Sequence, residues 1–245
     1  MKKLLKCIAL SGILVFALSA CETLGDNKKE TPTVVGQIAY NCASEYGYTL
    51  YITEGGKKVP YVVLTNNYQD HTLLLRKEIL AIKTYSEESD NYYAASNVDR
   101  YLQEQYLTLF ENDFKKILST VDIDISCEFP NETKKETISR KAFLLSASEV
   151  GLNSDLLYIK TGKTLSYFYN EKNLVAEYES NKCSWYLRSA YLEDRSLVCG
   201  VSATGQTGGG SVSYSSGVRP AICVPNNLPI KGIEKENSIY YYIDF

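Results

Sequence analysis

The side chains that most often perform catalysis are few in this chain, and they are not arranged as a catalytic set. His71 is the only histidine, and no Ser or Cys motif beside it provides a nucleophile that it could activate. No Gly-x-Ser-x-Gly sequence occurs in the chain. Gly162-Lys163-Thr164 matches the end of a phosphate-binding loop, but Leu157 stands where that loop requires a glycine. We therefore expect no catalytic residue, and we interpret His71 as a structural or surface side chain.

Seven cysteines offer thiol chemistry, and five of them lie beyond the first 21 residues. These five are Cys42, Cys127, Cys183, Cys199 and Cys223. An odd number allows at most two disulfides, whose connectivity cannot be derived from a sequence. We expect Cys183 and Cys199 to be either a disulfide that ties the strand at Trp185 to its neighbour or two buried thiols. No Cys-x-x-Cys pair occurs, so with a single histidine we expect no metal ion and no cofactor.

Two arginines, Arg188 and Arg219, stand inside apolar segments. A buried guanidinium needs carboxylate or carbonyl partners, because an unpaired buried charge is very costly. Glu149 and Asp194 are the candidate carboxylates. Two interpretations stay open: the arginines lock the terminal strand to the core, or they line a pocket for an anion or a carboxylate.

Tyrosine is frequent, with 21 Tyr against 7 Phe and 1 Trp. A tyrosine ring with its polar tip suits half-buried strands and recognition surfaces alike, and strands are the commoner setting. Tyr214 lies in a glycine-rich stretch, Gly205 to Ser216, that is either a loop contacting a ligand or a plain connector. The candidate binding residues are Trp185, Arg188, Tyr214 and Arg219.

The amino-terminal segment has the pattern of an export signal. Three lysines precede an apolar run, Ile8 to Leu18, that is too short to remain in a bilayer as a spanning helix. Leu18-Ser19-Ala20-Cys21 then resembles the lipobox of bacterial lipoproteins. The resemblance implies cleavage before Cys21 and a thioether-linked diacylglycerol on this residue, with palmitate-type chains that hold the protein stably at a membrane. The alternative is an ordinary secretory signal that ends in a cysteine by chance.

Behind the signal peptide, residues 1–20, composition divides the chain into a tether and one domain. Residues 21–33 are polar, charged and contain proline, which is typical of a flexible linker. Residues 34–245 are long enough to form a single extracellular domain. The formal net charge of the full chain is −3 and no basic patch occurs, so we expect no nucleic-acid partner.

Apolar patterning predicts an α+β fold, with a mostly antiparallel twisted sheet, one main helix and one or two short ones. Glu54-Gly55-Gly56-Lys57 is the predicted turn of a hairpin. The main helix is expected at 98–118 after a capping box that begins at Ser96, and Ser146 with Glu149 opens a brief second helix. The predicted strands are 34–40, 46–52, 59–64, 72–76, 142–145, 185–188, 197–202 and 218–224.

Four segments follow one another in a recognisable order. They are Val62-Val63-Leu64 with Leu73-Leu74-Leu75, Ala142-Phe143-Leu144-Leu145-Ser146 with Glu149, Trp185-Tyr186-Leu187-Arg188-Ser189, and Gly217-Val218-Arg219-Pro220-Ala221. This order resembles a family of extracellular domains of unknown function from Gram-positive anaerobes, with the pattern FLLS..E, WWLRS and GVRPA. The resemblance covers about residues 61–225, with Arg76 in place of a serine and Tyr186 in place of the second tryptophan. The closing segments are similar to C-type-lectin-like and formylglycine-generating-enzyme-like folds, which implies a fold of that character.

These observations predict a lipoprotein held by Cys21 on the extracellular face of the cell membrane. We expect a non-catalytic binding or envelope-associated module whose partner is a glycan, a peptide or an envelope protein. The alternative is an enzyme, an oxidase or hydrolase on a formylglycine-generating-enzyme-like scaffold. That alternative requires Cys183, Cys199 or Arg219 to face a shared cleft.

Overall fold

The computed structural model describes residues 32–38, 49–88, 90–129, 132–152, 158–192, 194–235 and 238–243, without the side chains of 127–129, 132–134, 233–235 and 238–239. The signal peptide, Cys21 and most of the predicted tether therefore lie outside the described residues, as do Cys42 and the side chain of Cys127. The chain from Thr31 to Phe245 forms one unit. No described helix is long and apolar enough to cross a membrane.

Most of the described strands belong to two sheets, which share one hydrophobic core. In order across the larger, seven-stranded sheet, the strands are β15 (Ile230–Lys235), β16 (Ser238–Ile243), β1 (Thr49–Glu54), β2 (Lys57–Tyr68), β3 (His71–Arg76), β14 (Ala221–Pro225) and β7 (Ala142–Phe143). Neighbouring strands in it are antiparallel except β1 and β16. The hairpin predicted at Glu54–Lys57 is confirmed, because β1 and β2 pair Glu54 with Lys57 and positive φ values at Gly55 and Gly56 make the turn.

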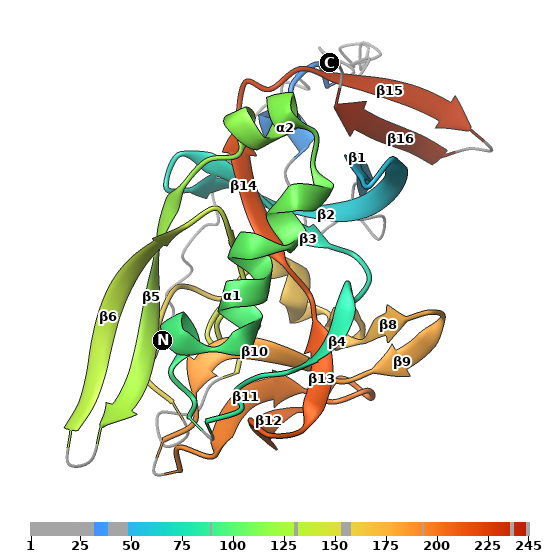
Figure 1. Ribbon diagram of the computed structural model, residues 1–245. Coiled ribbons are helices and arrows are strands. Elements are labelled where there is room, and N and C mark those ends of the chain that lie inside the picture. The colour runs from blue at the N-terminus through green and yellow to red at the C-terminus, as the bar shows by residue number, and fades with distance from the viewer. Residues whose placement is uncertain are drawn as a thin grey trace, which may run out of the picture. The chain divides into compact units, whose positions relative to one another are not determined.

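The second sheet has five strands and carries the segments of greatest functional interest. Its order is β12 (Thr207–Ser211), β11 (Leu197–Val201), β10 (Trp185–Ala190), β13 (Ser215–Val218) and β4 (Ala81–Thr84). Figure 1 shows it in the lower part of the view. Two hairpins complete the strands, β5 (Val121–Phe129) with β6 (Glu132–Arg140), and β8 (Ala176–Tyr178) with β9 (Asn181–Cys183). Strand β5 packs against β10, which brings the first hairpin to the sheet.

The predicted main helix is divided into three short pieces. They are α1 (Asn97–Glu104), a 3-10 turn at Tyr106–Leu109, and α2 (Asn112–Ile117). The Ser96 hydroxyl accepts a hydrogen bond from the Asp99 amide at 3.0 Å, so the predicted cap of the first piece is confirmed. Phe110 and Glu111 adopt extended backbone angles, which interrupt the helical hydrogen bonds before α2. Other 3-10 turns lie at Val35–Ile38, Tyr93–Ala95, Ser166–Tyr169 and Glu171–Leu174.

The α+β class and the mostly antiparallel pairing are confirmed, while several local predictions are wrong. The strand expected at 34–40 is instead a 3-10 turn at Val35–Ile38, with 39–40 outside the described residues. The glycine-rich stretch contains β12, although glycine disfavours strands. The segment 218–224 is not one strand, because the chain leaves β13 at Val218 and enters β14 at Ala221.

The two residues between β13 and β14 connect the two sheets. Pro220 has no backbone N–H to give to a sheet, which suits a position between strands. Its carbonyl accepts a hydrogen bond from the Arg76 amide of β3 at 3.0 Å, so the chain joins the larger sheet directly at Pro220. The core therefore runs continuously from one sheet into the other at this crossing.

Candidate functional site

Arg188 and Glu149 form an ion pair that is sealed from solvent. Nη1 of Arg188 lies 2.6 Å from Oε2 of Glu149, and Nη2 lies 2.9 Å from Oε1. Both side chains are 1% exposed. This parallel, two-bond geometry is the strongest arrangement of an arginine and a carboxylate. Of the two carboxylates expected from the sequence, Glu149 is therefore the partner, whereas the carboxylate of Asp194 accepts hydrogen bonds from Ser196.

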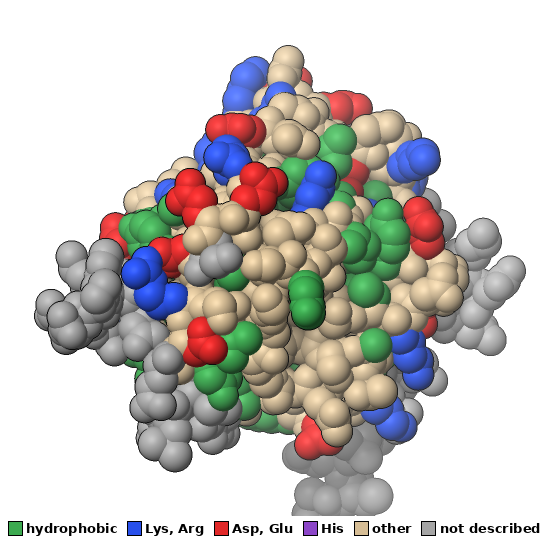
Figure 2. Space-filling model, turned by 60° about the horizontal axis from the view of Figure 1, so that its bottom comes forward, with side chains coloured by type: hydrophobic (Ala, Val, Ile, Leu, Met, Phe, Trp, Pro, Cys, Tyr) green, Lys and Arg blue, Asp and Glu red, His purple; other side chains and the backbone are tan. Residues whose placement is uncertain are grey.

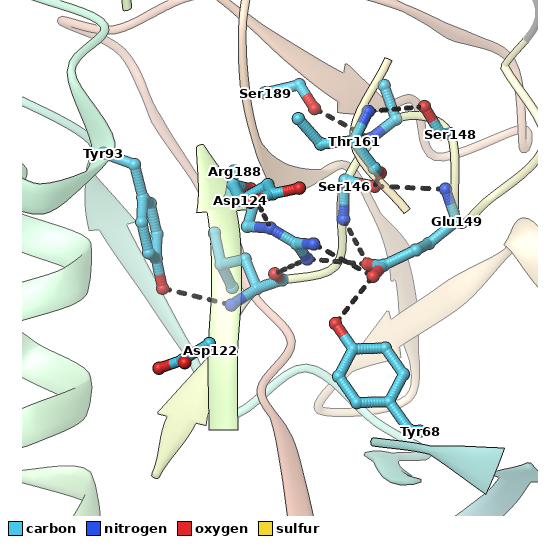
Figure 3. A network of polar contacts seen from close by, with 12 residues as sticks. Tyr68, Tyr93, Asp122, Asp124, Ser146, Ser148, Glu149, Thr161, Arg188 and Ser189 are labelled. Carbon is cyan, nitrogen blue, oxygen red and sulfur yellow. Dashed lines mark hydrogen bonds and ion pairs between the residues drawn. The ribbon is translucent and has the colours of Figure 1, made fainter. Parts of the chain in front are cut away.

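Local hydrogen bonds fix the Glu149 carboxylate in place. The Ser146 amide donates to Oε2 at 2.7 Å, and the Ser146 hydroxyl accepts from the Glu149 amide at 3.1 Å, which is the reciprocal pattern of a capping box. The predicted box is thus present, but it opens a single turn of chain rather than a helix. The Tyr68 hydroxyl donates to Oε1 at 2.8 Å from β2. Figure 3 shows these groups reaching the carboxylate from different sides.

Arg188 donates two further hydrogen bonds to backbone carbonyls. Its Nε donates to the Asp124 carbonyl of β5 at 3.0 Å, and Nη1 donates to the Leu144 carbonyl at 2.8 Å. The guanidinium carbon lies 5.7 Å from the centre of the Phe143 ring, whose other neighbour is the stacked ring of Tyr68. These contacts join β10, β5, β2 and the turn after β7 around one charge (Figure 3). We call this set the Arg188 network.

The surroundings of Arg188 and Tyr68 keep both side chains protonated near neutral pH. Burial alone would lower the pKa of Arg188, but the charge of Glu149 outweighs it and raises the pKa of the guanidinium above its ordinary value. Burial, together with the Glu149 carboxylate, raises the pKa of the Tyr68 hydroxyl. Tyr68 therefore stays protonated and keeps donating its hydrogen bond.

A glycine lets the chain pass directly over the ion pair. Gly162 has φ +84°, and a Cβ atom at this position would lie 2.9 Å from Cγ and Oε1 of Glu149. Glycine is therefore required both by the backbone angle and by the close approach. The Gly-Lys-Thr sequence rejected as a phosphate loop thus has a structural reason for its glycine.

An open cavity of about 800 Å³ lies above the network, and we call it the Glu149 cavity. Its lining is mostly polar, with amides, hydroxyls and carboxylates from four segments of the chain, and the buried Glu149 and Arg188 lie at its base. Tyr169 stands at the cavity with 68% of its surface exposed. The polar side chains that line it include Asn66, Asn67, Gln69, Asp122, Asp124, Thr137, Lys163, Thr164 and Ser166. This site has no signature in the sequence, because its side chains come from loops and strand ends that have no common spacing.

Arg219 occupies a different environment from Arg188. Its guanidinium is buried, lies 5.0 Å from the Trp185 ring centre, and donates to the carbonyls of Arg76 at 3.1 Å and Asn173 at 3.4 Å. No described carboxylate forms an ion pair with it. Burial lowers the pKa of this guanidinium, partly opposed by Tyr167. Arg219 thus packs against Trp185 and bonds to backbone carbonyls within the core.

A groove of about 430 Å³ lies on the five-stranded sheet, and we call it the glycine groove. It is lined by β12 and by parts of β10, β11 and β13, with Tyr214 beside them at 76% exposure. No charged residue lines it. Figure 2 turns the lower side of Figure 1 forward and shows a broad area of uncharged polar side chains and backbone, with charged side chains around it.

The described thiols are not paired. Cys183, Cys199 and Cys223 are free, so the alternative of a disulfide between Cys183 and Cys199 is wrong. Cys199 and Cys223 are buried, and Cys183 is half-buried at the end of β9. Burial raises the pKa of the Cys199 thiol to about 12, which keeps it in the unreactive protonated form. Because Cys199 and Arg219 are sealed in the core, they do not share an open cleft with Cys183, as the enzyme alternative required.

The remaining candidates for chemistry are surface features. Nδ1 of His71 lies 2.6 Å from the carbonyl oxygen of Gln69 in an exposed turn. Within the described part of the chain, no cluster of three or more His, Cys, Asp or Glu residues has the geometry to hold a metal ion.

Comparison with protein families gives one match, which covers most of the domain. The family described as Domain of unknown function (DUF6273) matches residues 69–226. This range includes the Arg188 network apart from Tyr68, the crossing at Pro220 and the whole glycine groove. No curated protein and no solved structure matches the chain.

The buried ion pair predicts a large effect of a single substitution. Glu149→Gln leaves the Arg188 guanidinium buried without its counter-charge, so we expect the free energy of unfolding in urea to fall by about 3–5 kcal/mol. The double variant Glu149→Leu/Arg188→Met removes both charges and should recover part of that loss, because the polar groups that bonded to the pair still lose their partners. Asp113→Ala breaks the exposed pair with Lys116 and should leave stability nearly unchanged. Equal effects of Glu149→Gln and Asp113→Ala would contradict the structural role of the pair.

Thiol burial predicts which cysteines react. On native protein at pH 8, we expect iodoacetamide to modify Cys183 and to spare Cys199 and Cys223 until denaturant is added, because the two buried thiols are protonated and inaccessible. Peptide mass spectrometry before and after unfolding measures this order. Rapid modification of Cys199 in the native state would show that its side chain reaches solvent.

Proposed function

We propose that this chain, which belongs to the DUF6273 family, is a lipid-anchored binding module on the outer face of the cell membrane. The Glu149 cavity is its ligand site, and a glycan is its ligand. The lipobox-like sequence ending at Cys21 supports the anchoring. The cavity supports the binding role, and the sealed positions of Cys199 and Arg219 speak against the enzymatic alternative.

The proposal rests mainly on the hydrogen-bonding side chains that line the cavity. A sugar hydroxyl both donates and accepts hydrogen bonds, so it matches side-chain amides, which do the same, and carboxylates, which accept. The wall contains amides at Asn66, Asn67 and Gln69 and carboxylates at Asp122 and Asp124. The Gln69 amide already bonds to the Asp122 backbone, so the carboxylates, which can each accept further hydrogen bonds, and the other amides are the groups for a ligand. Only two aliphatic residues line it, so an apolar ligand would find little surface to cover.

An exposed aromatic ring completes this set. Tyr169 presents most of its surface at the cavity, where the apolar face of a sugar ring can stack on it. Its neighbour Phe168 is buried and contacts Tyr167, which anchors the 3-10 turn that carries Tyr169. The ring is therefore presented by a fixed piece of backbone.

The Arg188 network gives the site a rigid floor. Tyr68, Glu149 and Arg188 have their charges and donors satisfied by one another, so they need no rearrangement when a ligand arrives. A preorganised site loses less conformational entropy on binding. The network thus positions the wall of the cavity while its own charges remain neutralised.

Glycan binding is tested with the full chain, solubilised in detergent, on an array of neutral and acidic oligosaccharides. We expect saturable binding to at least one neutral structure, and Tyr169→Ala should weaken it at least about tenfold because the stacking surface is lost. The matched variant Tyr214→Ala removes an equally exposed ring from the glycine groove. Loss of binding in Tyr214→Ala with retention in Tyr169→Ala, or no saturable binding at all, would contradict the assignment.

Anchoring is tested in a bacterial host by changing Cys21→Ser. The unmodified chain should partition into the detergent phase of a Triton X-114 separation, and mass spectrometry should find a mature start at Cys21 that carries acyl chains. Cys21→Ser should move the protein to the aqueous phase or leave the signal uncut. A Cys21 without acyl chains in the unmodified protein, or an unmodified protein in the aqueous phase, would contradict the proposed anchor.

A further inference from the structure

Strand β12 contains glycines that the fold itself does not require. A Cβ atom built on Gly208 or Gly210 would meet no atom within 4 Å, and neither residue has a positive φ. The glycine between them differs, because a Cβ on Gly209 would lie 2.8 Å from the ring of Tyr191. Close packing therefore accounts for Gly209 alone.

Gly208 and Gly210 lower the stability of β12 relative to residues with side chains. Glycine in the middle of a strand is destabilising by about 0.5–1 kcal/mol relative to alanine, because its backbone loses more freedom on folding. Glycine in a strand often marks a place where a ligand or another backbone approaches closely. A Cβ atom on Gly208 or Gly210 would meet no described atom of this chain, so the space beside these two glycines is open to a group from another molecule.

The outer side of β12 can accept a further strand. Among the described strands, β12 is the last in its sheet and pairs only with β11. The Ser202 amide donates to the Gln206 carbonyl (2.7 Å), and the Val212 amide donates to the Ser196 carbonyl (2.9 Å). These two bonds establish which residues of β12 point their backbone groups toward β11 and which point them outward. By the antiparallel rule, Gly208 and Gly210 bond inward to β11, so Thr207 and Gly209 direct their N–H and C=O groups outward.

The usual protection of an exposed strand edge is missing here. Natural sheets guard their edges with lysine, proline or inward-pointing charges. No Asp, Glu, Lys, Arg or His occurs between Arg195 and Arg219, and the only proline nearby, Pro220, lies outside β12. Figure 2 shows the same absence of charge over the middle of this side of the molecule.

The glycine groove beside this edge has room for a side chain. Gly208 pairs with Gly200 of β11, so backbone without side chains forms part of the groove floor. Tyr214 stands beside the floor, held by a hydrogen bond from the hydroxyl of Tyr186 to its carbonyl. An aromatic ring on a neighbouring strand is known to pack across glycines at a sheet edge and to replace the missing contacts.

We propose that β12 receives an extended, uncharged peptide segment of another protein as an additional strand, with an aromatic side chain of that segment lying over Gly208 and Gly210. The uncharged surroundings favour an uncharged occupant, because a charged side chain would be desolvated here without a partner. A second copy of this chain is a poorer occupant, since its own β12 brings glycines and leaves the groove empty. This inference does not depend on the Glu149 cavity.

The test uses the full chain in detergent and a synthetic uncharged decapeptide in which tyrosine and threonine alternate. We expect saturable binding by fluorescence anisotropy, and methylation of the peptide's alternate backbone amides in one register should weaken it at least about tenfold, because those amides pair with β12. Methylation in the other register should have a much smaller effect. Equal binding of all three peptides would overturn strand addition.

A matched pair of protein variants tests the glycine floor. Gly208→Val/Gly210→Val places side chains where space is open, so the melting temperature should stay the same or rise, while peptide binding should fall at least about tenfold. Ile82→Thr alters an exposed residue on β4, at the opposite edge of the same sheet, and should leave binding unchanged. Retained binding in a stable double variant would overturn the proposal. Sedimentation showing a dimer that the double variant abolishes would assign the edge to a second copy instead.

Discussion

The buried ion pair between Arg188 and Glu149 is the interaction on which the arrangement of this domain depends. Two charges removed from water are tolerated only when they are well supplied with hydrogen-bond partners. Here all three guanidinium nitrogens donate, and both carboxylate oxygens accept. The partners come from β10, β5, β2 and the turn after β7, which are far apart in sequence. Displacement of any of these segments would leave a buried charge incompletely satisfied, so the pair specifies their relative positions. The two segments noted in the sequence as FLLS..E and LRS are therefore the two halves of one contact.

Arg219 is also a buried cation, but different groups compensate its charge. It has carbonyl oxygens and the face of Trp185 around it rather than a carboxylate, so its charge is spread over dipoles and a ring. Trp185 in turn donates its indole N–H to the Leu174 carbonyl at 2.8 Å. One arginine thus fixes the polar network under the Glu149 cavity, and the other fixes the crossing between the sheets. Neither is free to act as an open anion site.

Sequence reasoning succeeded where a local rule determines the structure. The hairpin at Gly55-Gly56, the cap at Ser96 and the capping box at Glu149 are local patterns, and all three are present. Glu149 could be named as a candidate partner of Arg188 because a buried guanidinium demands a carboxylate. The Glu149 cavity could not be predicted, since Tyr68 and Tyr169 look like any other tyrosines of a strand-rich chain. Strand β12 was missed because its pairing with β11 overrides the low strand preference of glycine.

The passage from β13 to β14 through Arg219 and Pro220 has a mechanical consequence. With only two residues between the strands, neither sheet can tilt or slide against the other without breaking the ladder on one side of the link. The two sheets therefore cannot bend about a hinge between them, which is a motion that many receptors use to enclose a ligand. The two surfaces proposed here for binding, the Glu149 cavity and the edge of β12, would then be complete before contact with a partner.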